Sequence, residues 1–113
     1  MTQSRKRRGR QSELLLAAYE PLKRIWPYAR AVNSGASGAD LEDTPGVSFE
    51  VKARRDLNIR AALRQAAKNA GVQLPVVVTR LNGQGAESIG EWPVIMRLDD
   101  FLHLWDERGN DGD

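Results

Sequence analysis

The chain has 113 residues, of which 41% are hydrophobic and 28% are charged; this balance is typical of one soluble globular domain, and the length is too short for two. It contains no cysteine and a single histidine, His103, which excludes disulfides, thiolate zinc sites, cysteine nucleophiles and sites built from several histidines. Any hydrolytic chemistry must therefore depend on carboxylates and lysine. The longest apolar runs, at 14–18 and 74–78, are far shorter than the roughly 20 residues that span a bilayer. We expect a cytoplasmic protein with no membrane partner.

The formal net charge of +2 is small, but it is distributed unevenly along the chain. Basic residues crowd the first ten positions, namely Arg5, Lys6, Arg7, Arg8 and Arg10. We predict a flexible basic arm at 1–11, a single folded domain at 12–106 and an acidic disordered tail at 107–113. A basic arm suits the phosphates of a nucleic acid, although a solvated tail without a partner is an equally good interpretation of the arm alone.

The N-terminal part of the domain predicts a helix that Ser12 caps and that runs to about Tyr19. Pro21 either kinks this helix or begins a second short helical turn, and the sequence leaves both interpretations open. A short strand is expected at 28–32. The segment 33–38 is so rich in glycine and serine that we expect a loop whose backbone can approach another group closely.

Two strands are expected on either side of a turn that contains proline and glycine. The first is short, at 39–43, the turn lies at 44–46, and the second strand, at 47–53, alternates between apolar and polar residues. One face of this strand carries Val47, Phe49, Val51 and Ala53, and the other carries Ser48, Glu50, Lys52 and Arg54. Glu50 and Lys52 therefore share a face.

The second half of the chain predicts a helix, two strands and a final helix. The first of these helices begins at Asp56 or Asn58 and ends at Gly71. The β-branched run 74–81 is typical of a central strand, and the strand expected at 92–98 contains a proline, which favours an edge. The order of the elements predicts an α/β fold with a mixed β-sheet of about five strands flanked by helices.

Two carboxylates and a lysine carry the chemistry that the sequence offers. Asp40 precedes Glu50 across the predicted turn, so a hairpin brings both side chains and Lys52 together at one end. Carboxylate oxygens of this kind suit Mg²⁺ or Mn²⁺, which keep several waters free for hydrolysis. A Glu-x-Lys triplet is common in so charged a chain, and a surface hairpin with an ordinary ion pair between Glu50 and Lys52 is the alternative.

The sequence around this hairpin resembles the PD-(D/E)xK nuclease superfamily, and within it the archaeal-type Holliday junction resolvases and the small resolvase-like endonucleases of actinobacterial phages. The likeness runs over 12–105, and its segments are 34–40, 45–52, 63–66, 70–71, 75–78 and 92–102. Asp40 and the run Glu50-Val51-Lys52 are its specific part. The resemblance implies a restriction-endonuclease-like fold, a nuclease domain at 12–106, and a Mg²⁺-dependent endodeoxyribonuclease that works as a homodimer without a small-molecule cofactor.

The resemblance also implies roles for individual residues. Asp40 and Glu50 would hold the metal with help from the carbonyl of Val51, and Lys52 would position or activate the attacking water. Asp43 competes with Asp40 as the first metal carboxylate. Because Asp43 abuts the predicted turn, we favour Asp40.

In the resolvase branch a glutamate on the first helix also faces the site, and Glu13 fits that place better than Glu20. A carboxylate at the start of a helix, stabilised by the helix dipole, is the alternative for Glu13. Gln65 resembles a glutamine near the metal in related nucleases, although a polar helix face is the commoner explanation. Ala39 stands where the name of the superfamily has proline, which is a departure from its pattern.

For DNA contacts we select the basic arm, the small-residue loop and the end of the alternating strand, namely Arg5, Lys6, Arg7, Arg8, Arg10, Ser34, Ser37, Arg54 and Arg55. No base-reading module is recognisable, so we expect recognition of DNA shape and backbone. The leading hypothesis is a structure-selective endonuclease that resolves Holliday junctions or other branched DNA. The alternatives are a nuclease of the same fold that acts on nicks, flaps or ends, and a basic DNA-binding module without catalysis.

Overall fold

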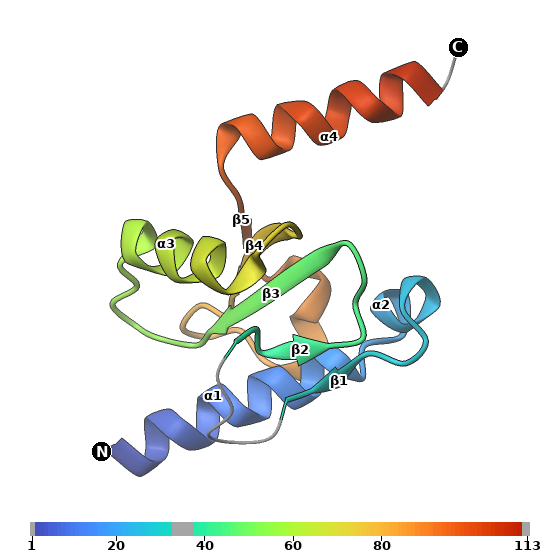
Figure 1. Ribbon diagram of the computed structural model, residues 1–113. Helices are drawn as coiled ribbons and strands as arrows, with labels where there is room; N and C mark the ends of the chain where they lie inside the picture. Colours follow the sequence, from blue (N-terminus) through green and yellow to red (C-terminus); the bar gives the residue numbers. More distant parts are fainter. Residues whose placement is uncertain (1, 33–37, 112–113) are drawn as a thin grey trace.

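The structure, a computed structural model, describes residues 2–32 and 38–111, with side chains over 7–32 and 38–108. Its elements follow the chain in the order α1 (Thr2–Ala17), α2 (Glu20–Ile25), β1 (Arg30–Ala31), β2 (Leu41–Glu42), β3 (Val47–Lys52), α3 (Ile59–Ala70), β4 (Leu74–Thr79), the 3₁₀ helix η1 (Ala86–Glu91), β5 (Val94–Ile95) and α4 (Leu98–Asp111). Figure 1 shows α1 and α3 on opposite sides of the central strands, with α4 set apart from them. The predicted α/β class is confirmed. Within the described part of the chain, none of the helices has the length and apolar character that a membrane crossing needs.

The strands form two small sheets instead of the single sheet of about five strands that the sequence predicts. β3 pairs with β4 in parallel and β5 pairs with β4 antiparallel, so this mixed sheet has the order β3-β4-β5. β1 and β2 form a separate antiparallel ladder. The backbone N–H of Asp40 donates to the carbonyl of Phe49 (2.8 Å), which joins the start of β2 to β3 without a continuous ladder. β3 therefore has an edge that this short segment approaches without forming a full strand pair with it.

Successive side chains of β3 face opposite layers, as the alternating pattern predicts. Phe49 and Val51 pack with Leu16 of α1 in the larger apolar core. Glu50 lies between them in the sequence and faces α3, where Asn69 donates to its carboxylate. Two parallel strands need a crossover connection, and α3 provides it between β3 and β4. The same helix thus closes the fold and supplies polar side chains to Glu50.

α3 begins and ends at residues that the sequence marks. Of the two predicted caps, Asn58 is the one used, because its Oδ1 accepts a hydrogen bond from the N–H of Ala61 (3.0 Å). Gly71 follows the last helical residue with a φ of 59°, a conformation that glycine adopts without strain. The predicted strands around α3 are present but shorter at their ends.

The prediction of a flexible arm is wrong over residues 2–11, because α1 already begins at Thr2. Ser12 lies inside this helix instead of capping it, and its Oγ donates to the carbonyl of Arg8 (2.7 Å). Lysine, arginine and glutamine are good helix formers, and here they extend the helix that the apolar residues of α1 anchor to the core.

Three further boundaries, nearer the middle and the end of the chain, either differ from the prediction or were left open by it. Pro21 lies in the first turn of α2, so the second of its two interpretations holds. The strand predicted at 92–98 is reduced to β5, because η1 precedes it and α4 begins at Leu98. α4 continues to Asp111, so the prediction of a disordered tail at 107–113 is wrong over its described residues. Acidic residues in the first turn of α4 and Arg108 in its last turn suit the helix dipole.

The substitution Asn58→Ala tests the start of α3. Loss of the side-chain cap leaves an N–H at the helix start without its partner, so we expect the free energy of unfolding to fall by about 1 kcal/mol. Urea denaturation of the full chain measures this. Asn58→Asp keeps a capping oxygen and should stay close to the wild type; equal losses for both variants would contradict the assignment.

Candidate functional site

The carboxylate of Glu50 is the centre of the site. Its side chain is only 1% exposed. The amide of Asn69 donates to its Oε1 (2.7 Å), and the Nζ of Lys52 lies 4.0 Å from its Oε2. Lys52 is 17% exposed and donates to the Oε1 of Gln65 (2.9 Å). Two polar residues of α3 therefore hold the two charged side chains of β3 in place.

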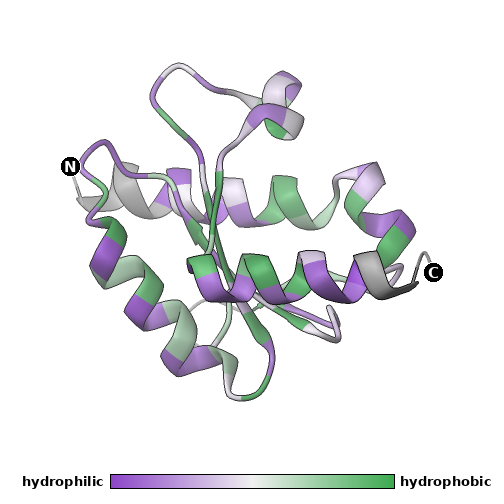
Figure 2. Ribbon diagram, turned by 90° about the horizontal axis from the view of Figure 1, so that it is seen from above, coloured by the Kyte–Doolittle hydropathy of each residue, from purple (hydrophilic) through white to green (hydrophobic). Residues whose placement is uncertain are grey.

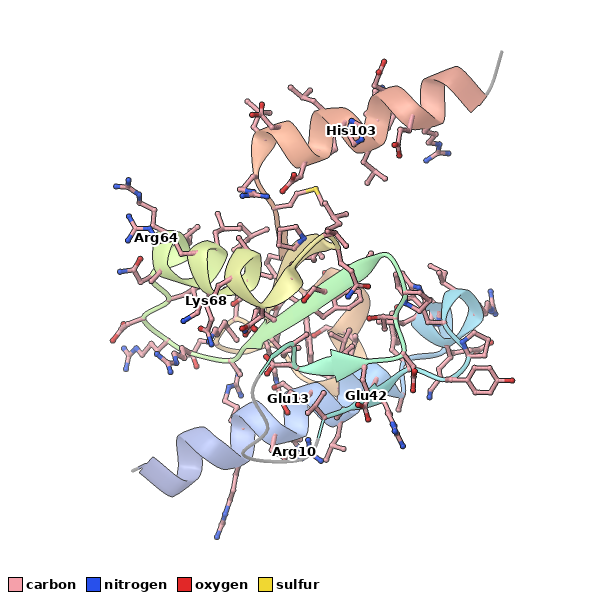
Figure 3. All side chains as sticks on the ribbon, viewed as in Figure 1. Arg10, Glu13, Glu42, Arg64, Lys68 and His103 are labelled. Carbon is pink, nitrogen blue, oxygen red and sulfur yellow. The ribbon has the colours of Figure 1, made fainter. Side chains whose placement is uncertain are left out.

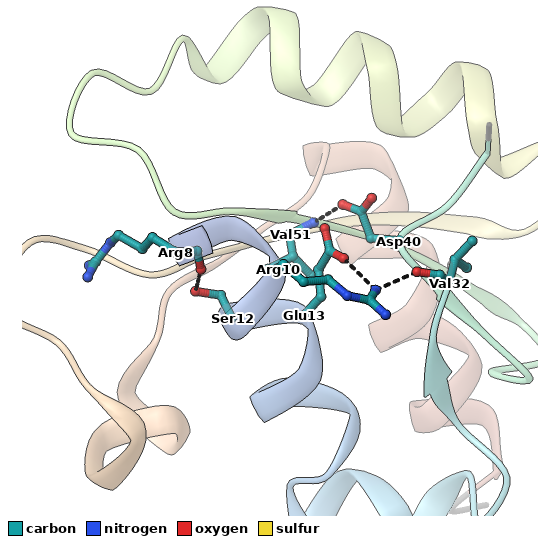
Figure 4. A network of polar contacts seen from close by, with 7 residues as sticks. All are labelled: Arg8, Arg10, Ser12, Glu13, Val32, Asp40 and Val51. Carbon is teal, nitrogen blue, oxygen red and sulfur yellow. Dashed lines mark hydrogen bonds and ion pairs between the residues drawn. The ribbon is translucent and has the colours of Figure 1, made fainter. Parts of the chain in front are cut away.

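Asp40 approaches Glu50 from the edge of β3. Its Oδ2 accepts a hydrogen bond from the backbone N–H of Val51 (2.7 Å; Figure 4). On the other side of the strand, the carbonyl of Lys52 accepts from the N–H of Arg80. Because successive carbonyls of a strand point in opposite directions, the carbonyl of Val51 points to the edge where Asp40 lies. Two carboxylates and one backbone carbonyl therefore converge at this edge.

α1 brings a third carboxylate, that of Glu13, to the same place. Its Oε1 lies 3.3 Å from the Nη1 of Arg10, which also donates to the carbonyl of Val32 (Figure 4). Burial raises the pKa of Glu13 and the charge of Asp40 raises it further, whereas Arg10 and Lys52 lower it. The mutual influence of these charges shows that Glu13 belongs electrostatically to the same cluster.

The electrostatics of the cluster favour the binding of a positive charge. Burial raises the pKa of Glu50 to about 7; the hydrogen bond from Asn69 lowers it, the charge of Asp40 raises it, and the charge of Lys52 lowers it. Asp40 thus acts electrostatically on both Glu50 and Glu13, and Lys52 acts on the same two carboxylates. Like charges held this close are relieved by a proton or by a bound cation.

The donor set fits a hard divalent cation that keeps several waters. Among the described residues, no group of three or more histidine, cysteine, aspartate or glutamate side chains is placed to hold a metal by itself. A metal here would have the carboxylates of Asp40 and Glu50, the carbonyl of Val51 and water as ligands. Mg²⁺ is commonly bound by one or two carboxylates with water completing its octahedral shell, so the residues present fit this ion.

The carboxylates of Asp43 and Glu20, the alternatives to Asp40 and Glu13, lie outside the cluster. Asp43 adopts a φ of 62°, is exposed, and lies 3.8 Å from the guanidinium of Arg30. Glu20 pairs with Arg24 on the surface of α2 (2.7 Å). The structure therefore brings Asp40 to β3 and leaves Asp43 and Glu20 outside the cluster.

The residues selected for DNA contacts are spread more widely. Exposed basic residues include three of the selected set and three of α3, namely Arg7, Arg54, Arg55, Arg60, Arg64 and Lys68. Figure 3 shows Arg10 and Glu13 on α1 and, across the sheet, Arg64 and Lys68 on α3. Ser34, Ser37 and the side chains of Arg5 and Lys6 lie outside the described residues.

Two arginines of the predicted arm are engaged with the body of the protein. Arg8 donates to the carbonyl of Leu81 (3.1 Å). Arg10 is held between Glu13 and Val32, so it does not belong to a free arm, and its contact with DNA stays a prediction. The guanidinium of Arg10 instead supports a carboxylate of the candidate site.

Sequence reasoning missed Asn69, the residue that holds Glu50. Asn69 follows Gln65 by four positions, so both lie on one face of α3, and this spacing is the signal that identifies it. Asn69 also lines an open cleft of about 640 Å³ between the turn after β2 and α3. Ser48 lines the same cleft, and its buried Oγ has no hydrogen-bond partner among the described residues. The polar face of β3 thus continues past Glu50 into this cleft.

Comparisons with known proteins add no family to this description. No family model, no curated protein and no solved structure matches the chain. The interpretation of the site therefore depends on its residues and their geometry.

The substitution Glu50→Gln tests the burial of this carboxylate. Because the pKa of Glu50 is raised from 4.5 to about 7 on folding, the protonated form stabilises the folded state. This contribution is fully present below pH 4.5 and is lost as the pH rises through about 7. We expect the free energy of unfolding of the wild type to fall over this interval by on the order of 3 kcal/mol, and Glu50→Gln to lack that fall.

Urea denaturation across this pH interval provides the measurement. Glu91→Gln, which removes an exposed carboxylate outside the cluster, should keep the pH dependence of the wild type. If Glu50→Gln keeps it as well, Glu50 does not titrate as the structure indicates.

Proposed function

We propose that the protein is a Mg²⁺-dependent endodeoxyribonuclease with a restriction-endonuclease-like fold, which hydrolyses phosphodiester bonds in branched DNA. One observation carries this proposal. Asp40, Glu50 and Lys52, which the sequence pattern groups as nuclease residues, converge at one edge of β3. The mixed β3-β4-β5 sheet with helices on both faces is compatible with the proposed fold.

Asp40 and Glu50 would hold the cation together with the carbonyl of Val51. Bound Mg²⁺, or Mn²⁺ in its place, supplies a Lewis acid for the phosphate and lowers the pKa of a coordinated water. The hydrogen bond from the N–H of Val51 fixes the carboxylate of Asp40, and Asn69 fixes that of Glu50. Both metal ligands are therefore oriented before any ligand arrives, which favours catalysis.

Lys52 is the residue placed to act on water and phosphate. The Oε1 of Gln65 accepts a hydrogen bond from the ammonium of Lys52. This bond orients the ammonium and leaves its other protons available. Its positive charge would stabilise the negative charge that develops on the phosphate in the transition state. Glu13, supported by Arg10, completes the site from the side of α1.

The choice of substrate follows from charge and from the resemblance. The exposed arginines Arg54 and Arg55 lie two and three residues after Lys52, the end of β3, where they can contact a phosphate backbone. Contacts of this kind do not read bases, which favours recognition of DNA shape. Four-way junctions and a homodimer with two sites on opposed strands come from the resemblance to the resolvases.

Cleavage assays on a synthetic four-way junction test the assignment of the residues. Lys52→Ala and Asp40→Asn each remove a group needed in the transition state, so we expect cutting to fall by at least about 100-fold. Binding of the junction, measured in Ca²⁺ by gel shift, should change little.

Asp43→Asn and Glu20→Gln are the matched controls, because these carboxylates lie outside the cluster. Both should cut normally. Normal cutting by Asp40→Asn together with loss of cutting by Asp43→Asn would overturn the metal assignment. If the wild type binds DNA but does not cut junctions, flaps, nicks or ends in Mg²⁺, the protein is a DNA-binding module without catalysis.

Binding of the metal can be measured without DNA. Mg²⁺ relieves the repulsion between Asp40 and Glu50, so it should raise the melting temperature of the wild type above pH 7. Asp40→Asn should show a much smaller increase, and Asp43→Asn the full one. An equal increase for wild type and Asp40→Asn would place the metal elsewhere.

A further inference from the structure

α4 carries an apolar stripe that no described part of its own chain covers. Every described side chain from Phe101 to Arg108 is exposed. Leu98, Phe101, Leu102 and Trp105 follow the spacing i, i+3, i+4, i+7 that places residues on one face of a helix. The rings of Phe101 and Trp105 stack with their centroids 6.3 Å apart. Figure 2 shows hydrophobic and hydrophilic positions alternating along α4.

A helix of this length needs a surface to pack against. Isolated helices shorter than about 12–15 residues are marginal in water, and helices in proteins draw most of their stability from packing of an apolar face. α4 has 14 residues, and Trp105 on its stripe is 63% exposed. A continuous apolar surface of this kind marks an interaction site.

The chain itself offers a surface that matches this stripe. α3 packs over β3 and β4, and next to it the edge strand β5 leaves Ile95 only partly buried. Leu63 of α3 and Ile95, which pairs with Val77, both pack against the smaller apolar core. Ile59, one turn earlier than Leu63 on the same helix face, is 52% exposed. These three residues, Ile59, Leu63 and Ile95, form what we call the α3–β5 strip.

The charges around the two surfaces are complementary. α3 has three basic residues and no acidic one, and Arg60 and Arg64 flank the α3–β5 strip on the side of the helix away from Gln65. α4 has four carboxylates against one arginine over its described side chains. Asp99 and Asp106, seven residues apart, border its apolar stripe. The acidic, apolar face of α4 therefore matches the basic, apolar surface around the α3–β5 strip, which a second copy of this chain also carries.

Within the described residues, α4 does not pack on the α3–β5 strip of its own chain. Only Met96 and Arg97 connect β5 to α4, and Met96 packs against the larger core. Arg97 is bonded to Asp100 (2.8 Å), and its carbonyl accepts from the N–H of Phe101. These contacts fix the direction in which α4 leaves the body, away from α3 (Figure 1).

We propose that α4 is a dimerisation helix that seats on the α3–β5 strip of a second copy of this chain. A two-fold axis makes the exchange reciprocal, so each copy covers the stripe of the other. Asp99 and Asp106 of one copy then face Arg60 and Arg64 of its partner. These surfaces lie outside the candidate active site, so the inference stands independently of DNA cleavage.

Light scattering coupled to size exclusion, on the full chain at several concentrations, tests the interface. The wild type should be a dimer. Leu102→Asp places a charge in the stripe and should give a monomer, whereas Leu104→Asp, an equally exposed leucine outside the stripe, should remain a dimer. Far-UV circular dichroism shows whether each variant is folded.

Charge reversal tests whether the basic residues beside the α3–β5 strip contact α4 of the partner. Arg64→Glu and Asp106→Arg should each weaken the dimer by about tenfold at low salt, and combining the two changes in one chain should restore it. A monomeric wild type, or a dimer that survives Leu102→Asp, would overturn the proposal. So would a dimer that Arg64→Glu leaves unchanged, since α4 would then pair with α4 or with another surface.

Discussion

The burial of Glu50 is the constraint on which the other features of this fold depend. A carboxylate that is 1% exposed is tolerated only when neighbouring groups satisfy it, so α3 must lie over β3 to bring Asn69 within 2.7 Å. Lys52 must share its face, and Asp40 must stay fixed against the strand. Replacing a buried charge by a well-packed apolar residue is often neutral or stabilising. A buried carboxylate with a raised pKa is typical of functional residues, and the metal site that we propose requires one.

The architecture follows from that requirement. β3 is an edge strand of the mixed sheet, so Asp40 can approach it from the open side while β4 covers the other. The residues that α3 turns toward the sheet are alanines at 62, 66 and 70, and their small side chains let the helix lie close to the strands. Gln65 and Asn69 then reach across to Lys52 and Glu50. The composition of α3 thus sets the positions of Glu50 and Lys52.

Local patterns predicted the elements that a single segment specifies. The alternation on β3 correctly placed Glu50 and Lys52 on one face, and Asn58 and Gly71 marked the ends of α3. Features that depend on distant contacts were not predictable. The sequence alone places Arg10 on a free basic arm, because its contacts with Val32 and Glu13 come from the fold. The strands divide into two sheets because Asp40 makes one backbone hydrogen bond to β3 in place of a ladder.

A titration of the side-chain carboxyl of Glu50 by carbon-13 NMR, with and without Mg²⁺, tests this account most directly. Without metal, Glu50 should titrate near pH 7, since burial raises its pKa. With saturating Mg²⁺, its pKa should fall well below that value, because the cation stabilises the carboxylate. A Glu50 that titrates at its ordinary pKa of 4.5, or that does not respond to Mg²⁺, would contradict a buried metal-binding carboxylate at the edge of β3.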